Sequence, residues 1–137
     1  LWEHGLDYNH GTGHGVGFVN TVHEAPTSIR NKINKDVFRN LEFEPGMIMS
    51  DEPGVYISGK HGIRMEILMT VVDKGDGFLG FEPLTMAPID SEPLLVEVMT
   101  KKDIEFYNKY QKQVYDSISY GLSEEEKAWL KELTKEI

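Results

Sequence analysis

Apolar and polar residues alternate along two neighbouring segments of the chain, residues 47–57 and 61–72, which are joined by the short run 58–60. Alternation with a period of two is typical of strands, and a short glycine-containing connection between two such strands predicts a β-hairpin. If the hairpin is symmetric about Gly59, one face is almost wholly apolar and is expected to pack on helices. That face consists of Met47, Met49, Val55, Ile57, Ile63, Met65, Ile67 and Met69.

The same register places two glutamates, Glu52 and Glu66, directly opposite each other on the other face. Opposed residues of an antiparallel pair have Cβ atoms about 4.5–5.5 Å apart, and two like charges at this distance are destabilising. Two interpretations remain open: both carboxylates are solvated on an open face of the sheet, or a cation lies between them.

The remaining N-terminal pattern predicts shorter elements. Residues 17–23 are rich in β-branched and aromatic side chains and predict a strand, whereas the polar residues 24–43 predict little regular structure. The sequence Glu-Pro-Gly at 44–46 predicts a turn, and residues 78–89 predict a further strand.

Apolar residues at helical spacing predict two helices in the last part of the chain. The first, residues 101–120, begins after Thr100 and is ended by Gly121, and the second begins after Ser123, which forms a capping-box pattern with Glu126. We expect the apolar stripes of these helices to be core rather than a binding site. The stripes consist of Ile104, Tyr107, Tyr110 or Gln111, Val114 and Ile118, and of Trp129, Leu130 and Leu133.

Composition narrows the class of protein. A chain of 137 residues forms one domain or a piece of one, and its start at Leu1 indicates a part of a longer protein. The formal net charge of −9 argues against a nucleic-acid-binding surface, and no apolar run reaches the roughly 18–20 residues that cross a bilayer. Cysteine is absent, which fits a reducing compartment, and we expect a cytoplasmic protein in which His, Asp and Glu hold any metal.

Residues 7–26 hold three histidines, His10, His14 and His23, among alternating glycines. A phosphate-binding loop is excluded, because neither the G-x-G-x-x-G nor the Gly-Lys-Ser/Thr spacing is present. Small neighbours on both sides of His14 let backbone and substrate approach closely. Taken singly, each histidine is more often a packed or surface residue than a ligand. Together with the opposed glutamates they favour a site for Mn²⁺, Co²⁺, Fe²⁺ or Zn²⁺ rather than Ca²⁺.

Four blocks in this order carry a resemblance to a known family: HGTGHGVGFVNTVHEAP, SDEPGVYI, GIRMEI and FEPLTMAPI. Together they resemble the catalytic domain of aminopeptidase P, the Xaa-Pro aminopeptidase of the pita-bread metallopeptidase fold, in its long three-domain form. The resemblance implies an α+β fold, the second half of a pita-bread domain, with an antiparallel curved sheet, flanking helices and C-terminal helices. Residues 1–90 would then be the C-terminal half of the catalytic domain, and residues 91–137 a C-terminal strand and helical extension of the same domain.

The resemblance also implies a cofactor. The family binds two divalent metal ions, usually Mn²⁺, with Zn²⁺ or Co²⁺ as alternatives, through two aspartates, one histidine and two glutamates. His14 matches the histidine ligand, Glu52 the first glutamate and Glu66 the second, which bridges the metals. Arg64 matches an arginine that orients a ligand carboxylate without binding the metal.

The implied reaction is hydrolysis of the N-terminal Xaa-Pro peptide bond by hydroxide that the metals generate near neutral pH. Glu52 would accept the proton of the water, His23 would stabilise the oxyanion together with a metal, and His10 matches a further histidine that contacts substrate. The implied partners are peptides with proline at the second position, and the implied full-length assembly is a homodimer. We expect neither nucleic acid nor membrane as a partner.

The chain departs from the family pattern at two ligands. Nothing in it matches the two aspartates, which lie upstream of the histidine in the family. We therefore expect that this chain alone is inactive and binds metal weakly or at one position. Three alternatives remain: a prolidase, which shares the fold and ligands but cleaves Xaa-Pro dipeptides, a pita-bread binding module without metals, and an α+β domain with accidental motifs.

Overall fold

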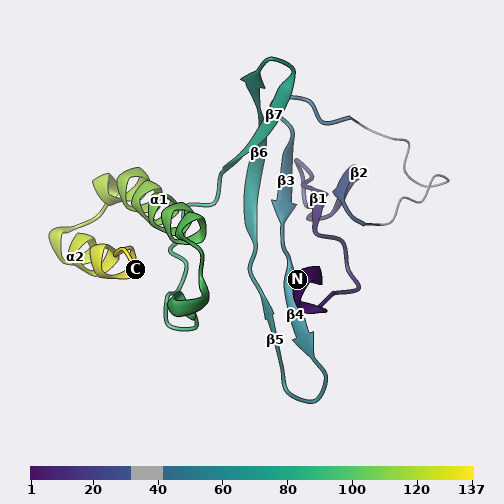
Figure 1. Cartoon of the computed structure of the whole chain (residues 1–137). Coiled ribbons are helices and arrows are strands. Elements are labelled where there is room, and N and C mark those ends of the chain that lie inside the picture. Colours follow the sequence, from purple (N-terminus) through teal and green to yellow (C-terminus); the bar gives the residue numbers. More distant parts are fainter. Residues whose placement is uncertain (32–41) are drawn as a thin grey trace. The chain divides into compact units, whose positions relative to one another are not determined.

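The computed structural model describes residues 1–31 and 42–137 and divides the chain into two compact units, Leu1–Thr85 and Met86–Ile137. In its described residues, the first unit consists of strands and one short 3-10 helix (Figure 1). These elements are η1 (Trp2–His4), β1 (Gly13–Gly15), β2 (Glu24–Ile29), β3 (Ile48–Asp51), β4 (Gly54–Ile57), β5 (His61–Arg64), β6 (Ile67–Gly75) and β7 (Phe78–Pro83).

The predicted hairpin is confirmed as one long antiparallel ribbon, in which β3 pairs with β6 and β4 pairs with β5 (Figure 1). The pairing is symmetric about Gly59 throughout, from Ile48 opposite Thr70 to Ile57 opposite His61. Gly59 lies in the turn with a φ of 71°, a conformation that glycine adopts without steric cost. The register predicted from symmetry about Gly59 is therefore confirmed.

The ribbon is interrupted where the two glutamates face each other. The β3–β6 ladder ends at Asp51, and the β4–β5 ladder begins at Gly54. Glu52 and Glu66 lie in this interruption, at the opposite positions that the common register requires. They therefore share one place along the ribbon without belonging to either ladder.

The apolar face of the ribbon is buried only at its β3–β6 end. Met49 and Met69 are 0% and 6% exposed, whereas Ile63 in β5 and Met65 directly after β5 are 53% and 45% exposed. No α-helix lies within the described part of this unit, so the expected packing of this face on helices is not made inside the unit.

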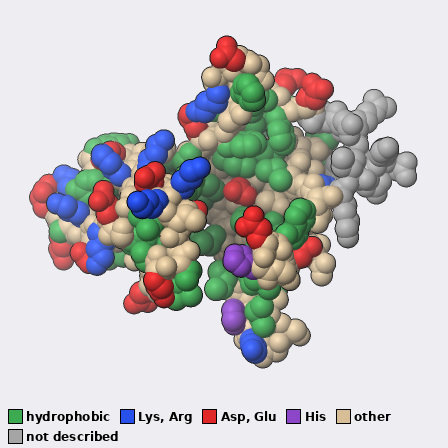
Figure 2. All heavy atoms as spheres, in the orientation of Figure 1, with side chains coloured by type: hydrophobic (Ala, Val, Ile, Leu, Met, Phe, Trp, Pro, Cys, Tyr) green, Lys and Arg blue, Asp and Glu red, His purple; other side chains and the backbone are tan. Residues whose placement is uncertain are grey.

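Five strands form one antiparallel sheet in the order β2-β1-β3-β6-β7, so β2 and β7 are its outer strands. The outer strand β7 exposes Phe78, Leu79 and Phe81. Figure 2 shows hydrophobic side chains gathered over this part of the sheet.

Residues 17–23 do not form the predicted strand. Gly17 donates its backbone N–H to the carbonyl oxygen of Thr21 over 2.7 Å, and Asn20 has a φ of 54°. These two features turn the chain back between β1 and β2, which the β-branched composition of the segment could not reveal.

Two other predicted limits also differ from the structure. The strand β2 lies inside the region 24–43 for which little regular structure is predicted, and residues 32–41 of that region lie outside the described residues. The strand predicted over residues 78–89 ends at Pro83, although Leu84 still donates its backbone N–H to the carbonyl oxygen of Leu68 over 2.7 Å. The turn predicted at 44–46 is confirmed.

The second unit contains two α-helices that begin at the predicted residues. They are α1 (Lys101–Ile118) and α2 (Glu124–Leu133), and the 3-10 turns η2 (Val96–Val98) and η3 (Ser119–Gly121) flank α1. Thr100 with Asp103, and Ser123 with Glu126, form reciprocal capping boxes. In the described ranges, no helix is both long and apolar enough to span a membrane.

The predicted apolar stripe of α1 is confirmed as core. Its buried residues are Tyr107, Tyr110, Gln111 and Val114. The Gln111 amide accepts from the N–H of Ile89 and donates to the carbonyl oxygens of Ile89 and Leu133, which ties α1 to the preceding segment and to α2. The predicted stripe of α2 is core only at Leu130, since Trp129 and Leu133 are 64% and 41% exposed.

Candidate metal centre

Three side chains with metal-binding atoms converge where β1, β2 and β3 meet. His14 is the middle residue of β1, His23 directly precedes β2, and Glu52 directly follows β3. One ligand atom of each lies within 4.8 Å of the others. The structure therefore brings the two predicted ligands His14 and Glu52 together, with the ring of His23 4.2 Å from that of His14 between centroids.

The His14 ring presents a lone pair to a carboxylate. Its Nδ1 lies 2.8 Å from the carbonyl oxygen of Gly15, and since a carbonyl can only accept, Nδ1 carries the hydrogen. In the neutral ring Nε2 is then unprotonated, yet it lies 3.1 Å from Oε1 of Glu52. Two acceptors at this distance need a positive partner between them, which is a proton on His14 or a bound cation.

Glu52 is 8% exposed and is held from several sides. Its backbone N–H donates to the carbonyl oxygen of Thr12 over 2.7 Å, and its Oε2 lies 3.5 Å from an Arg64 guanidinium nitrogen. On the Oε1 side the hydroxyl of Ser50 lies 3.3 Å away. A buried carboxylate with these contacts is restricted in its rotation.

A chain of hydrogen bonds joins Arg64 to His10 through Tyr56. His10 Nδ1 donates to the carbonyl oxygen of Gly11 over 2.7 Å, so Nε2 accepts from the Tyr56 hydroxyl over 2.8 Å. The same hydroxyl accepts from Nε of Arg64 over 2.8 Å. This bond, helped by the negative charges of Glu52 and Glu66, raises the pKa of the Arg64 guanidinium above its ordinary value.

Tyr56 is a site residue that sequence reasoning missed. It lies on the same face of the ribbon as Glu52 and Arg64, at an even-numbered position between them. That position was a usable signal, because the register makes Arg64 a diagonal neighbour of Tyr56, within reach of an aromatic side chain.

Glu66 is not part of the His14–His23–Glu52 cluster in the described residues. It is exposed, and its link to the site is the charge that it places near Arg64. The register places it opposite Glu52, but the ribbon's interruption leaves its carboxylate outside the group of ligand atoms.

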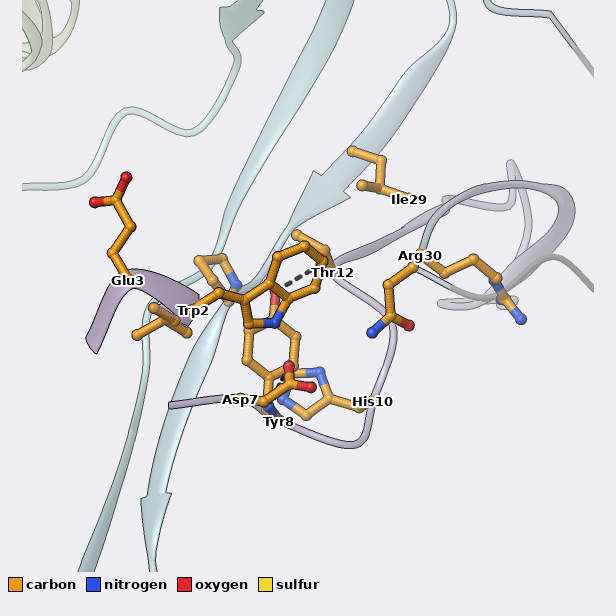
Figure 3. Close-up of a pocket in the computed structure, with 11 residues that line it drawn as sticks. Trp2, Glu3, Asp7, Tyr8, His10, Thr12, Ile29 and Arg30 are labelled. Atoms are coloured by element: carbon orange, nitrogen blue, oxygen red, sulfur yellow. Dashed lines mark hydrogen bonds between the residues drawn. The ribbon is translucent and has the colours of Figure 1, made fainter. Parts of the chain in front are cut away.

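Two cavities meet at His10. One, of about 260 Å³, is lined by each predicted site residue other than Glu66, together with Arg30. The other, of about 550 Å³, is lined by Trp2, Tyr8 and Ile29 among others (Figure 3). The Tyr8 ring stacks on His10 with 4.6 Å between centroids. His10, like Arg30, thus lines both the smaller cavity over the ligand cluster and the larger cavity, whose lining includes aromatic and aliphatic side chains.

The glycines that flank His14 serve close approach of neighbouring backbone. A Cβ on Gly13 would lie 2.0 Å from the carbonyl oxygen of Ser50, and one on Gly15 would lie 2.5 Å from that of Glu24. Any other residue at either position would therefore require the backbone to move. The predicted role in backbone approach is confirmed on both sides of His14.

The residues present fit a divalent metal ion. Two ligand atoms bound to one ion at about 2.0–2.2 Å can lie at most about 4.4 Å apart. The 3.1 Å between His14 Nε2 and Glu52 Oε1 satisfies this limit. An imidazole nitrogen with carboxylate oxygens is a ligand set for Mn²⁺, Co²⁺ or Zn²⁺ rather than for Ca²⁺.

Comparison with known proteins gives matches along the whole chain. Sequence models of the metallopeptidase family M24 and of the C-terminal region of peptidase M24 match residues 1–73 and 77–137. The chain is 39% identical to a probable Xaa-Pro aminopeptidase P of Coprinopsis cinerea and 36% identical to aminopeptidase P1 of Arabidopsis thaliana. Both matches cover 100% of the chain but only 23% and 22% of the relatives, so the chain spans under a quarter of their length.

A solved structure is also similar. It is the crystal structure of an X-prolyl aminopeptidase from Caenorhabditis elegans, described as a cytosolic enzyme with a di-nuclear active site. The TM-score is 0.87 at 33% sequence identity, and the match covers 100% of this chain and 23% of that one. This likeness confirms the predicted α+β, pita-bread type of fold.

Proposed function

Since the chain belongs to the metallopeptidase family M24, we propose that it is part of a metallo-aminopeptidase that hydrolyses the N-terminal Xaa-Pro bond of peptides. The observation that carries this proposal is the pair of facing acceptor atoms, His14 Nε2 and Glu52 Oε1. Relatives named as Xaa-Pro or X-prolyl aminopeptidases are similar over the whole chain, which supports the substrate class.

His14, Glu52 and Glu66 would hold two divalent ions in the full-length protein, together with ligands from outside this chain. Mn²⁺ is the proposed metal, with Zn²⁺ and Co²⁺ as alternatives. When bound, the ions supply a water of lowered pKa and polarise the substrate carbonyl. Ligation by Glu66 requires its exposed carboxylate to turn toward Glu52, across the interruption of the ribbon.

Glu52 is the proposed acceptor of the proton of the attacking water. Its Oε1 lies on the side of His14, and its Oε2 is held by Arg64, so Arg64 orients the carboxylate. Because Glu52 is only 8% exposed, few water molecules can compete with it for that proton. The proton would then pass to the departing nitrogen.

His23 and His10 are the proposed substrate-facing histidines. His23 is exposed, lines the smaller cavity and lies beside His14, which suits a donor to the carbonyl oxygen as negative charge develops. Both ring nitrogens of His10 are occupied, by Gly11 and by Tyr56. The observation that supports a role for His10 is that it lines both cavities. To contact substrate, its ring would have to give up one of these two hydrogen bonds.

Proline makes the reaction depend on proton delivery. The proline ring restricts the backbone conformation of proline and of the residue before it. Cleavage of this bond therefore needs a site that accepts that conformation. The departing nitrogen is a secondary amine, which leaves only when it is protonated. Glu52, a buried general base within the ligand cluster, meets that requirement.

Hydrolysis of two substrates by the full-length protein tests the proposal. Release of the first residue from an Xaa-Pro-Yaa tripeptide, abolished by chelation and restored by Mn²⁺, is the expected result. Preference for an Xaa-Pro dipeptide would instead identify a prolidase. Metal analysis without any bound ion, together with binding of peptide that is not cleaved, would identify a binding module.

Further parts of the proposal concern the chain as a whole. We assign residues 1–90 to the C-terminal half of the catalytic domain and residues 91–137 to its C-terminal extension. We place the full-length protein in the cytoplasm and propose that it is a homodimer. The absence of cysteine in this chain and the cytosolic relative from Caenorhabditis elegans support the location. This chain alone would be inactive, because no aspartate pair of the family spacing precedes His14 within it.

A further inference from the structure

We propose that Ser50 is a positioning residue of the metal centre, and this proposal rests on the proposed function. One hydroxyl group, on the penultimate residue of β3, would fix the Glu52 carboxylate relative to the backbone of His14. Ser50 is 0% exposed, although serine is mostly a surface residue. A fully buried hydroxyl in a short strand requires partners, and its partners are two ligand residues.

The Ser50 hydroxyl both accepts and donates a hydrogen bond. Its oxygen accepts the backbone N–H of His14 over 3.0 Å, and its hydrogen points to Oε1 of Glu52 over 3.3 Å. A carboxylate can only accept and an N–H can only donate, so both roles are assigned without choice. The single hydroxyl therefore sets where Oε1 lies with respect to His14.

The local backbone explains why a side chain is needed there. β1 and β3 share one ladder pair, Gly15 with Met49, and the chains come so close beside it that Gly13 has no room for a Cβ against Ser50. The next N–H of β1, on His14, bonds the Ser50 side chain instead of a carbonyl oxygen. Ser50 thus continues the strand pairing up to the point where the ligand atoms begin.

Ser50 and Arg64 hold different oxygens of the same carboxylate. Arg64 approaches Oε2 with a side chain that is 46% exposed, whereas Ser50 approaches Oε1 from inside the protein. Oε1 is the oxygen that faces His14 Nε2. The buried contact is therefore the one that controls the atom nearest to the other ligand.

The test is Mn²⁺ affinity of the full-length protein by calorimetry, with Ser50→Ala, Ser50→Thr and Ser50→Val. Loss of a partner that orients a ligand weakens metal binding about 10- to 100-fold, which is the rise in Kd expected for Ser50→Ala. Threonine and valine have the same shape and differ only in the hydroxyl. The Kd for Mn²⁺ of the Thr variant should therefore be at least about 10-fold lower than that of the Val variant.

Thr134→Val is the matched control, because it also removes a buried hydroxyl, one that donates to the Leu130 carbonyl oxygen in the second unit. It should lower the melting temperature and leave the Kd for Mn²⁺ unchanged. Equal affinities of the Thr and Val variants, both folded by circular dichroism, would overturn the role of Ser50. A wild-type protein that binds no Mn²⁺ would overturn the proposed function itself, and this proposal with it.

Discussion

His14 and Glu52 face each other through two acceptor atoms, Nε2 and Oε1, that lie 3.1 Å apart. The Nδ1 hydrogen is committed to the Gly15 carbonyl oxygen, so the ring cannot relieve this contact by changing its tautomer. Glu52 cannot turn away freely, since Ser50 and Arg64 hold its two oxygens. The pair is therefore arranged for a positive charge between its members.

The first prediction concerns these two residues in the full-length protein. His14→Ala and Glu52→Gln each remove an atom of a proposed metal ligand, and Glu52→Gln also removes the proposed general base. We expect each to lower kcat/KM for an Xaa-Pro-Yaa tripeptide by at least about 100-fold, since loss of a ligand costs more than the 10- to 100-fold typical of the groups that orient one. His61→Ala, on the exposed β5 strand, is the histidine control and should retain full activity. Wild-type rates for both ligand variants would contradict the site.

The second prediction concerns the Tyr56 hydroxyl, which connects Arg64 to His10. Tyr56→Phe keeps the ring and deletes both hydrogen bonds, one of them to a charged group. Hydrogen bonds to charged groups contribute about 1.5–3 kcal/mol, so kcat should fall about 10-fold or more. Tyr120→Phe, at a side chain that is 86% exposed, is the control. If the two phenylalanine variants are equally active, the network has no part in the reaction.

The third prediction concerns packing around His14. In Gly13→Ala the new Cβ would lie 2.0 Å from a backbone oxygen of Ser50, which cannot move as a side chain tip can. We expect a loss of about 3 kcal/mol in the free energy of unfolding, at the upper end of typical overpacking. Gly121→Ala meets nothing within 4 Å and should be neutral or stabilise by about 0.4–1 kcal/mol. Urea denaturation distinguishes the two, and equal midpoints would show that β1 can shift.

The sequence predicted the ribbon better than the elements around it. Alternation of side chains depends on the pleat of the strand alone, so it predicted the two faces of the ribbon. Symmetry about Gly59 then predicted the register that places Glu52 opposite Glu66. Cap residues act within one helical turn, so Thr100 and Ser123 located the starts of both helices. The strand predicted at 17–23 failed because the turn there depends on Asn20 and on a backbone bond to Gly17, not on β-propensity.

The candidate site divides in the same way. The motifs supplied His14 and Glu52 as residue types, and the fold brought them together. Tyr56 and Ser50 were not recognised, because a hydroxyl has a role only through the atoms that surround it. Those atoms belong to His10 and Arg64 for Tyr56, and to His14 and Glu52 for Ser50. Tertiary contacts between strands far apart in sequence carry this information.

The fourth prediction concerns acid stability of the second unit. Hydrogen bonds from Thr100 lower the pKa of the Asp103 carboxyl, and those from Ser123 lower that of Glu126. A carboxyl whose folded pKa is depressed stabilises the fold fully above its unfolded value, about 3.9 for Asp and 4.3 for Glu, and this is lost as pH falls through the folded value. The melting temperatures of wild type and of Asp103→Ala and Glu126→Ala should therefore differ at pH 7, and the differences should shrink as the pH falls below about 4.

Glu105→Ala, in α1 but outside either capping box, is the control for this pH series. Its difference from wild type should not follow the same course. A gap for Asp103→Ala that stays constant from pH 7 to pH 3 would show that the capping bonds do not depend on the charge of the carboxyl.

The fifth prediction concerns the 137-residue chain without the rest of the protein. Two adjacent divalent ions concentrate positive charge. The three proposed ligands of this chain, His14, Glu52 and the exposed Glu66, carry too little negative charge to neutralise both ions. Titration with Mn²⁺ should therefore show one weak site at most, and His14→Ala should remove it, whereas His61→Ala should leave it unchanged. Two tight Mn²⁺ sites on the isolated chain would mean that its own side chains complete the centre.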